Sequence, residues 1–185
     1  FKLNKKNNKD LKDYLTSRKY GSNDWVFYYK KPNFKIDDFF KKQKINNKIV
    51  VTLLTNIIWD AQIFFPKNIF RSMMEWIFET IEFFKNNEKI SLIIRVHPAE
   101  YNTDRVSLQR VSYEIKKKYK KFPNNLIIID SNNNLSSYSL AEKSDLVIVY
   151  SSNIATELAA SNVNIICAGE AMIKNKLISI DPKNK

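Results

Sequence analysis

Three consecutive residues with hydrogen-bonding side chains, Ser151, Ser152 and Asn153, follow an apolar run that ends at Tyr150. If this run is a strand and the next segment a helix, the free backbone N–H groups and the helix dipole attract an anion, and the hydroxyls add donors. Capping of the helix, worth about 1 kcal/mol, explains one of the three residues but not all of them. The pattern therefore predicts that a diphosphate binds at residues 151–153.

The only histidine, His97, stands at the end of another apolar run and is followed by Pro98. With an ordinary pKa of about 6.5, an imidazole beside a phosphate can act as a neutral donor or as a cation that stabilises a departing anion. Arg95 lies two residues earlier, so on a strand its side chain points to the same face as that of His97. We therefore predict a catalytic role for His97, with Arg95 and Glu100 in the donor-binding group.

Two further carboxylates are candidates by position. Glu157 lies five residues beyond Ser152, where it can accept hydrogen bonds from a ribose diol whose phosphate sits at the helix start. Asp60 closes the loop after the first apolar run, where an acid can meet the sugar or an acceptor hydroxyl, and it is the second predicted catalytic residue. One histidine and scattered carboxylates do not make a ligand cluster, so no metal site is predicted.

Five short apolar runs rich in β-branched residues are typical of strands buried on both faces. They cover residues 49–55, 91–96, 125–129, 146–149 and 163–166. Apolar spacing between them predicts helices over residues 69–84, 106–119, 135–143 and 153–161. This alternation predicts an α/β fold with a doubly wound parallel sheet, in which ligands bind at the carboxyl ends of the strands. We expect the polar residues that follow these runs to meet there.

Residues 46–185 are predicted to form this Rossmann-like domain, while residues 1–45 are predicted to be an N-terminal appendage or interdomain segment with a helix near 8–19. The chain begins at Phe1 without an initiator Met, and we interpret it as a fragment. An aromatic and methionine stripe at 69–84 would suit a membrane-binding face, but its helical spacing between two strands favours packing in the core.

Composition excludes several classes of protein. The chain has two glycines, which rules out the G-x-G-x-x-G and P-loop phosphate motifs, and one cysteine, Cys167, which rules out an internal disulfide. No run approaches the roughly 20 apolar residues of a membrane span, so a cytoplasmic protein is expected. The net charge of +12 does not predict nucleic-acid binding, because stacking aromatics are not interleaved with the lysine clusters.

The segments RVHPAE at 95–100, SDLVIVYSSNIATELAASNVNII at 144–166 and TNIIWDA at 55–61 resemble the C-terminal domain of GT-B glycosyltransferases of the capsule polysaccharide group. The resemblance covers about residues 48 to 175. It implies transfer of a sugar from a CMP- or UDP-linked donor, without another cofactor, to a polysaccharide or glycolipid acceptor. His97 and the two serines would bind the donor phosphate, and Glu157 would lie near its ribose.

The resemblance also implies an N-terminal GT-B domain as partner, and peripheral attachment at the inner face of the membrane. Because that domain commonly supplies the base that deprotonates the acceptor, this chain is expected to bind a nucleotide but to turn over poorly by itself.

Two alternatives remain. Teichoic acid polymerases that use CDP-glycerol share the His-Pro and Tyr-Ser-Ser segments, although an aspartate typically stands where this chain has Val149. A noncatalytic basic α/β module is the second alternative, and its affinity for a partner should fall steeply with salt.

Overall fold

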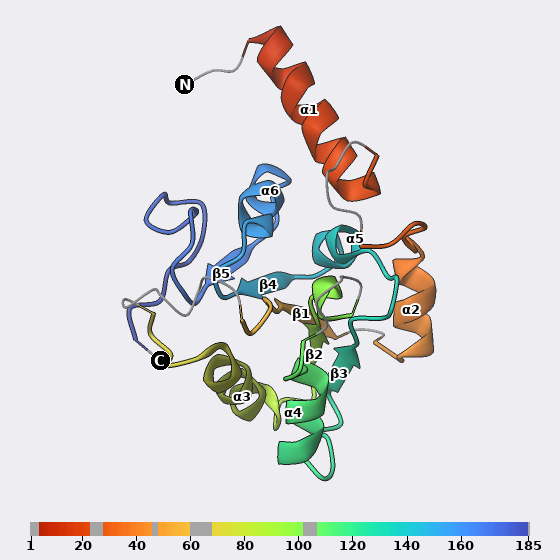
Figure 1. The fold of residues 1–185 in the computed structure, drawn as a ribbon, viewed down its shortest axis with the longest axis vertical. Coiled ribbons are helices and arrows are strands. Elements are labelled where there is room, and N and C mark those ends of the chain that lie inside the picture. Colours follow the sequence, from red (N-terminus) through yellow and green to blue (C-terminus); the bar gives the residue numbers. More distant parts are fainter. Residues whose placement is uncertain (1–3, 23–27, 46–47, 60–67, 102–106, 185) are drawn as a thin grey trace.

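A five-stranded sheet in the order β3-β2-β1-β4-β5, with every neighbouring pair parallel, forms the centre of the computed structural model (Figure 1). The structure describes residues 4–22, 28–45, 48–59, 68–101 and 107–184. The strands are β1 Ile49–Leu54, β2 Ile90–Arg95, β3 Leu126–Ile129, β4 Leu146–Val149 and β5 Ile165–Cys167. All five predicted strands are confirmed, within one or two residues at nearly every end.

Two helices precede the sheet, α1 Lys5–Tyr20 and α2 Ile36–Lys42. Four more alternate with the strands: α3 Met73–Phe84, α4 Val111–Lys118, α5 Ser137–Glu142 and α6 Ile154–Ala160, with a 3₁₀ turn at Pro98–Glu100. The four helices predicted between the strands are confirmed, but each is shorter than predicted, α3 and α4 by the most residues. The pattern did not predict α2, a helix of one or two turns.

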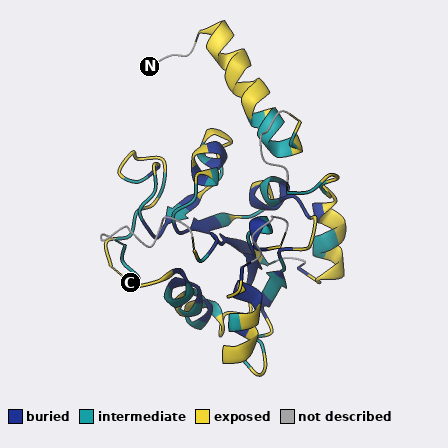
Figure 2. Ribbon diagram, viewed as in Figure 1, coloured by how far each residue is buried: buried dark blue, intermediate teal, exposed yellow. Residues whose placement is uncertain are grey.

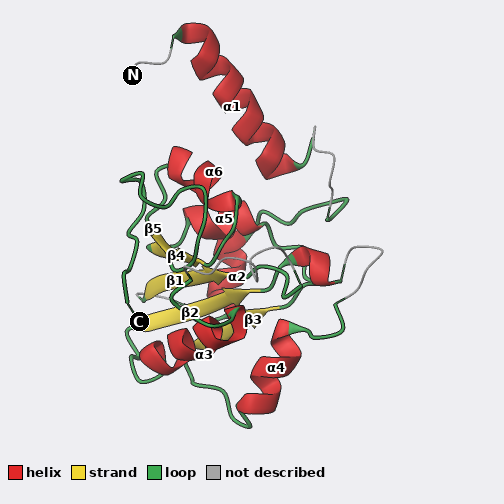
Figure 3. Cartoon of the chain, turned by 60° about the vertical axis from the view of Figure 1, so that its left-hand side comes forward, coloured by secondary structure: helices red, strands yellow, loops and turns green. Residues whose placement is uncertain are grey.

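Helices cover both faces of the sheet (Figure 3). On one face, α3 and α4 pack on alternate strand residues such as Val51 and Leu53. On the other face, α2 and α5 pack against residues that include Val50, while α6 packs beside β4 and β5. Apolar residues on both faces of β1 are the physical reason that its sequence shows no alternation with polar residues. The predicted doubly wound α/β fold is confirmed.

The stripe on α3 packs into the core, as favoured from its spacing. Trp76, Ile77 and Ile81 are almost completely buried, and the Trp76 ring stacks on Tyr150 with 5.3 Å between ring centroids. Only the side away from the sheet, represented by Phe83, is widely exposed. Among the described residues, no helix is both long enough and apolar enough to cross a membrane.

Part of the segment before residue 46 belongs to the same packed body as the sheet. Ile36 and Ile45 are buried in one cluster with Val50, and Asn33 forms a parallel bridge with Leu135. Helix α1 differs, because none of its residues is buried and most of its length extends away from the domain (Figure 2). Residues 36 and 45 therefore pack with the sheet, whereas α1 contributes no buried residue.

Candidate functional site

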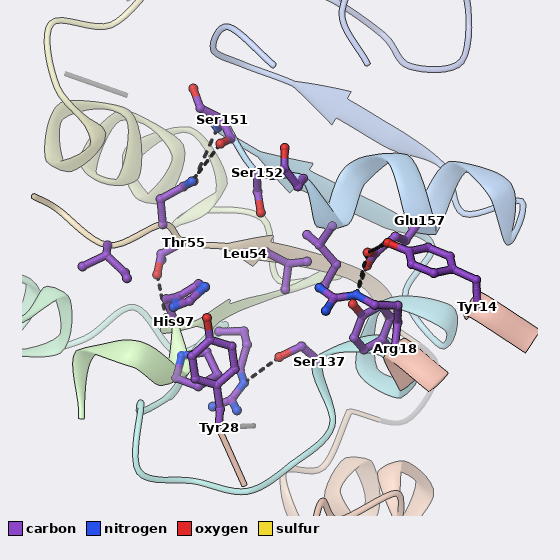
Figure 4. Close-up of a pocket in the computed structure, with 17 residues that line it drawn as sticks. Tyr14, Arg18, Tyr28, Leu54, Thr55, His97, Ser137, Ser151, Ser152 and Glu157 are labelled. Carbon is purple, nitrogen blue, oxygen red and sulfur yellow. Dashed lines mark hydrogen bonds and ion pairs between the residues drawn. The ribbon is translucent and has the colours of Figure 1, made fainter. Parts of the chain in front are cut away.

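A cavity of about 470 Å³ opens at the carboxyl ends of the central strands (Figure 4). From β1 the chain builds β2 and β3 on one side, and then returns to place β4 on the other side of β1. Such a reversal leaves a crevice between the diverging loops, which is where open α/β sheets bind ligands. The loops after three strands line it, with Thr55 and Asn56 after β1, His97 and Pro98 after β2, and Ser151, Ser152 and Asn153 after β4.

The end of β1 holds the other two loops in place. Thr55 Oγ1 accepts a hydrogen bond of 2.9 Å from the backbone N–H of His97. The Asn56 amide donates to the Ser151 carbonyl at 2.9 Å and accepts from the Ser151 N–H at 3.4 Å. Two adjacent side chains therefore fix the spacing between the histidine loop and the serine loop. Neither residue is among the site residues predicted from the sequence.

His97 has one ring nitrogen engaged in its own loop. Its Nδ1 accepts from the Ala99 N–H at 3.2 Å, and the ring meets Tyr28 edge-on with 5.3 Å between centroids. A nitrogen that accepts a hydrogen bond carries no proton, so the neutral imidazole has its proton on Nε2. Nε2 is therefore the atom with which His97 can donate to a ligand in the cavity.

The serine loop leads directly into α6, as predicted. Asn153 begins that helix without a side-chain capping hydrogen bond, so capping does not account for the polar run. Within the described structure, Ser151 Oγ is buried and has no hydrogen-bond partner. The turn is tight, since a Cβ on Gly169 would lie 2.6 Å from the Tyr150 carbonyl oxygen and 2.9 Å from Ser151 Oγ. Ser152 and Asn153 are therefore better placed than the Ser151 hydroxyl to meet a ligand.

Glu157 lines the cavity, and its carboxylate contacts side chains from two helices. Oε1 accepts from Tyr14 OH at 2.9 Å and from Arg18 Nε at 2.8 Å, and Oε2 accepts from Tyr138 OH. Burial, together with this carboxylate, raises the pKa of Tyr138 above its ordinary value, so the phenol stays protonated and donates. Glu157 thus joins α1 and α5 to α6.

The guanidinium of Arg95 binds several groups of the protein itself. Its guanidinium is almost fully buried, and burial lowers its pKa from the ordinary value. The N–H groups donate to the carbonyls of Asp130, Asn133 and Leu135 and to the hydroxyls of Ser137 and Tyr29. Arg95 borders the cavity, but its hydrogen bonds organise the loop between β3 and α5 and are not directed at a ligand.

The structure does not bring Glu100 into the cavity. Its carboxylate is completely buried behind the 3₁₀ turn, where both oxygens lie 3.3 Å from the Val111 N–H at the start of α4. A carboxylate there satisfies a backbone donor that the helix cannot satisfy itself. Glu100 therefore anchors the loop and does not line the cavity.

This burial makes stability depend on pH through Glu100. Burial raises the pKa of Glu100 from 4.5 to about 7, with Asp130 adding to the rise. The folded chain then holds a proton that the unfolded chain loses, so the contribution of Glu100 to stability is fully present below pH 4.5 and is lost as the pH rises through 7. At about 1.4 kcal/mol per pKa unit, the fall amounts to roughly 3 kcal/mol. Urea unfolding between pH 5 and 8 should show Glu100→Gln with a flatter profile than wild type.

The matched control is Glu114→Gln on α4, the helix whose first N–H Glu100 binds; Glu114 lies in the first turn of α4 and is not fully buried. It should keep the wild-type profile. An unchanged profile in Glu100→Gln would contradict the assignment of this titration to Glu100.

Asp60, the second predicted catalytic residue, lies outside the described residues, whereas its neighbour Trp59 donates through Nε1 to Ser107 Oγ at 3.0 Å.

Burial raises the pKa of the Cys167 thiol to about 11, so it is not a nucleophile at neutral pH. In the part of the chain that the structure describes, no three histidine, cysteine or acidic side chains gather closely enough to hold a metal ion.

Sequence reasoning missed most of the aromatic wall of the cavity. Tyr14 and Arg18 come from α1, Tyr28 precedes α2, and Tyr138 belongs to α5. Tyr14 and Arg18 lie four residues apart on a predicted helix, so they share one face. This spacing was the sequence feature that could have indicated that they act together. Which carboxylate they meet depends on how α1 docks, and no local pattern encodes that.

No protein-family model matches the chain, and no curated protein matches it. Several solved structures are similar to it. Thermosulfurimonas dismutans KpsC, beta Kdo 2,4 transferase, is 14% identical with a TM-score of 0.48, over 92% of this chain and 53% of that chain. The S. aureus MnaA–UDP co-structure is 15% identical with a TM-score of 0.46, over 77% and 32%. A putative UDP-N-acetylglucosamine 2-epimerase from Listeria monocytogenes is 13% identical with a TM-score of 0.45, over 68% and 28%. The chain therefore spans about half or less of these structures.

Proposed function

We propose that this chain is the donor-binding domain of a glycosyltransferase that uses a nucleotide-activated sugar, CMP- or UDP-linked, in bacterial capsule or surface polysaccharide synthesis. One observation carries the proposal. The His-Pro segment and the two serines of the Tyr-Ser-Ser segment, on which the resemblance to such transferases rests, line a single cavity at the point where the strand order reverses.

The donor phosphate would lie between the histidine loop and the serine loop. On the serine side, the Ser152 hydroxyl is a donor by position, whereas the N–H groups of Ala155 and Thr156 already donate to the carbonyls of Ser152 and Asn153. On the histidine side, the Nε2–H of His97 would face the oxygen on which negative charge grows as the sugar leaves. Donors fixed in place before the reaction stabilise that charge without reorganisation, which is the contribution expected from this half of the site.

The acceptor side of the reaction lies beyond these residues. We propose that the acceptor is a polysaccharide or glycolipid and that a second domain completes the cleft. Asp60 stays a proposed catalytic acid near the sugar or the acceptor hydroxyl.

Calorimetric titration of the 185-residue chain with CMP, CDP, UDP and GDP tests the proposal. A cytidine or uridine nucleotide should bind selectively. The variants His97→Ala and Ser152→Ala should each weaken binding about tenfold or more, because each removes a hydrogen bond to a charged group worth about 1.5–3 kcal/mol.

Ser161→Ala serves as a control, since Ser161 ends the same helix α6 and does not line the cavity. Its affinity should match that of wild type. Equal affinity of all variants, or no binding to the folded chain at millimolar nucleotide, would count against a donor site here.

A further inference from the structure

Helix α1 is attached to the domain by polar contacts and not by burial. Its side chains are lysine- and asparagine-rich, none is buried, and Gly21 ends it in the left-handed conformation with a φ of 65°. Contacts come from its C-terminal half, where Tyr14 and Arg18 reach Glu157 and Lys19 pairs with Glu142 at 2.6 Å. The position of α1 on the domain therefore depends on the contacts that Tyr14 and Arg18 make at the cavity.

The carboxylate of Glu157 is largely used by these contacts. An ionised carboxylate has about four positions at which it can accept a hydrogen bond. Tyr14, Arg18 and Tyr138 occupy three of them, and only 7% of the Glu157 side chain is exposed. Little capacity remains for both hydroxyls of a ribose, so orientation of Arg18 is the role that these contacts support.

Arg18 in turn lies where a ligand would be. Its side chain is 29% exposed and lines the same cavity as His97 and Ser152. In Figure 4 its guanidinium lies on the cavity side of Glu157, on the wall opposite His97. Glu157 binds Nε, and in Figure 4 the rest of the guanidinium extends from there into the cavity, where Arg18 also interacts with Tyr138. Guanidinium groups in this arrangement bind phosphoryl oxygens with two parallel hydrogen bonds.

We propose that Arg18 is a second anion-binding residue of the cavity, supplied by α1, oriented by Glu157 and directed at a phosphoryl group of the ligand. The inference rests on the proposed function, because it takes this cavity as the ligand site. Glu157 is then a positioning residue that acts through Arg18. The cavity has two phosphate-binding sides, one at the histidine and serine loops and one at α1.

The test is titration of inorganic pyrophosphate, UDP and uridine into the wild-type chain, Arg18→Gln and Lys12→Gln. Arg18→Gln should weaken pyrophosphate and UDP about tenfold or more and leave uridine unchanged, since uridine has no phosphoryl group. Lys12→Gln removes the same charge from an exposed position of the same helix and should change each affinity less than about twofold. Circular dichroism should show that both variants keep their helices.

Lys19→Gln separates the guanidinium from the docking of α1. It removes the ion pair with Glu142 but keeps Arg18, and Lys19 does not line the cavity, so pyrophosphate affinity should stay within about threefold of wild type. An equal loss in Lys19→Gln and Arg18→Gln would overturn the inference, because helix docking would then explain both losses.

Two further outcomes separate a failure of the proposed role of Arg18 from a failure of the proposed donor site. Equal pyrophosphate binding by wild type and Arg18→Gln, or no binding by wild type, overturns the role of Arg18. If pyrophosphate binding depends on Arg18 but no nucleotide binds more tightly than pyrophosphate, the inference holds and the proposed donor site fails.

Discussion

Replacement of Arg95 by alanine should lower the free energy of unfolding by about 3–5 kcal/mol. The side chain is 2% exposed, so the substitution leaves a buried cavity and removes the donor from one buried and two partly buried carbonyls. The carbonyls of Asp130, Asn133 and Leu135 would all lose the same partner. Unsatisfied buried polar groups cost about 1–3 kcal/mol each, less whatever entering water recovers. Urea unfolding at constant pH measures the loss.

Two variants control this prediction. Arg95→Lys keeps the charge but cannot bridge carbonyls that point at a planar fork, so it should recover only part of the loss. Arg110→Ala removes an exposed arginine that lies over the Tyr101 ring, and it should change stability by less than about 1 kcal/mol. If Arg95→Ala unfolds at the same urea concentration as Arg110→Ala, the loop between β3 and α5 does not depend on the guanidinium.

Replacement of Trp76 by alanine should cost about 3–5 kcal/mol and should also weaken nucleotide binding. Trp76 is 1% exposed on α3, and its ring stacks on Tyr150 with an interplanar angle of 23°. Tyr150 directly precedes Ser151, and its hydroxyl donates to the Phe70 carbonyl at 3.0 Å. A cavity at position 76 would therefore loosen the residue from which the serine loop starts.

Phe83→Ala is the matched control, because Phe83 belongs to the same helix but is 80% exposed. It should change stability by less than about 0.5 kcal/mol. Paired urea unfolding and calorimetry on the two variants give both readouts. A Trp76→Ala chain that loses stability but binds nucleotide with wild-type affinity would show that the serine loop is held by its own contacts, such as those with Asn56.

The sheet was predictable from sequence because its strands are buried on both faces. Runs such as 49–54 and 146–149 have almost no polar residue to break them, and β-branched side chains dominate. Helix ends were less predictable, since α3 begins at Met73 although apolar spacing continues back to Ile69. The short helix α2 escaped prediction because its burial depends on Ile36 meeting a sheet face that is distant in sequence.

The site was predictable where it follows the strands and unpredictable where it depends on docking. His97, Ser151 and Ser152 line the cavity because strand ends of a parallel sheet share one edge. The sequence did not predict that Arg95 and Glu100 bind backbone groups of the protein, because residue type alone does not reveal whether a buried charge meets a ligand or a backbone group. The hydrogen bonds that separate the two cases come from residues 11 to 40 positions away in sequence.

The two side chains at the end of β1 join segments that come together at different costs in chain entropy. Thr55 binds a residue 42 positions later, whereas Asn56 binds a residue 95 positions later. Closure of a longer loop loses more entropy, and contacts between distant segments slow folding. The histidine loop can therefore form with the first half of the sheet, but the serine loop arrives only when β4 joins β1. The cavity exists only in the completed fold, so any ligand that fills it selects fully folded molecules and stabilises them by mass action.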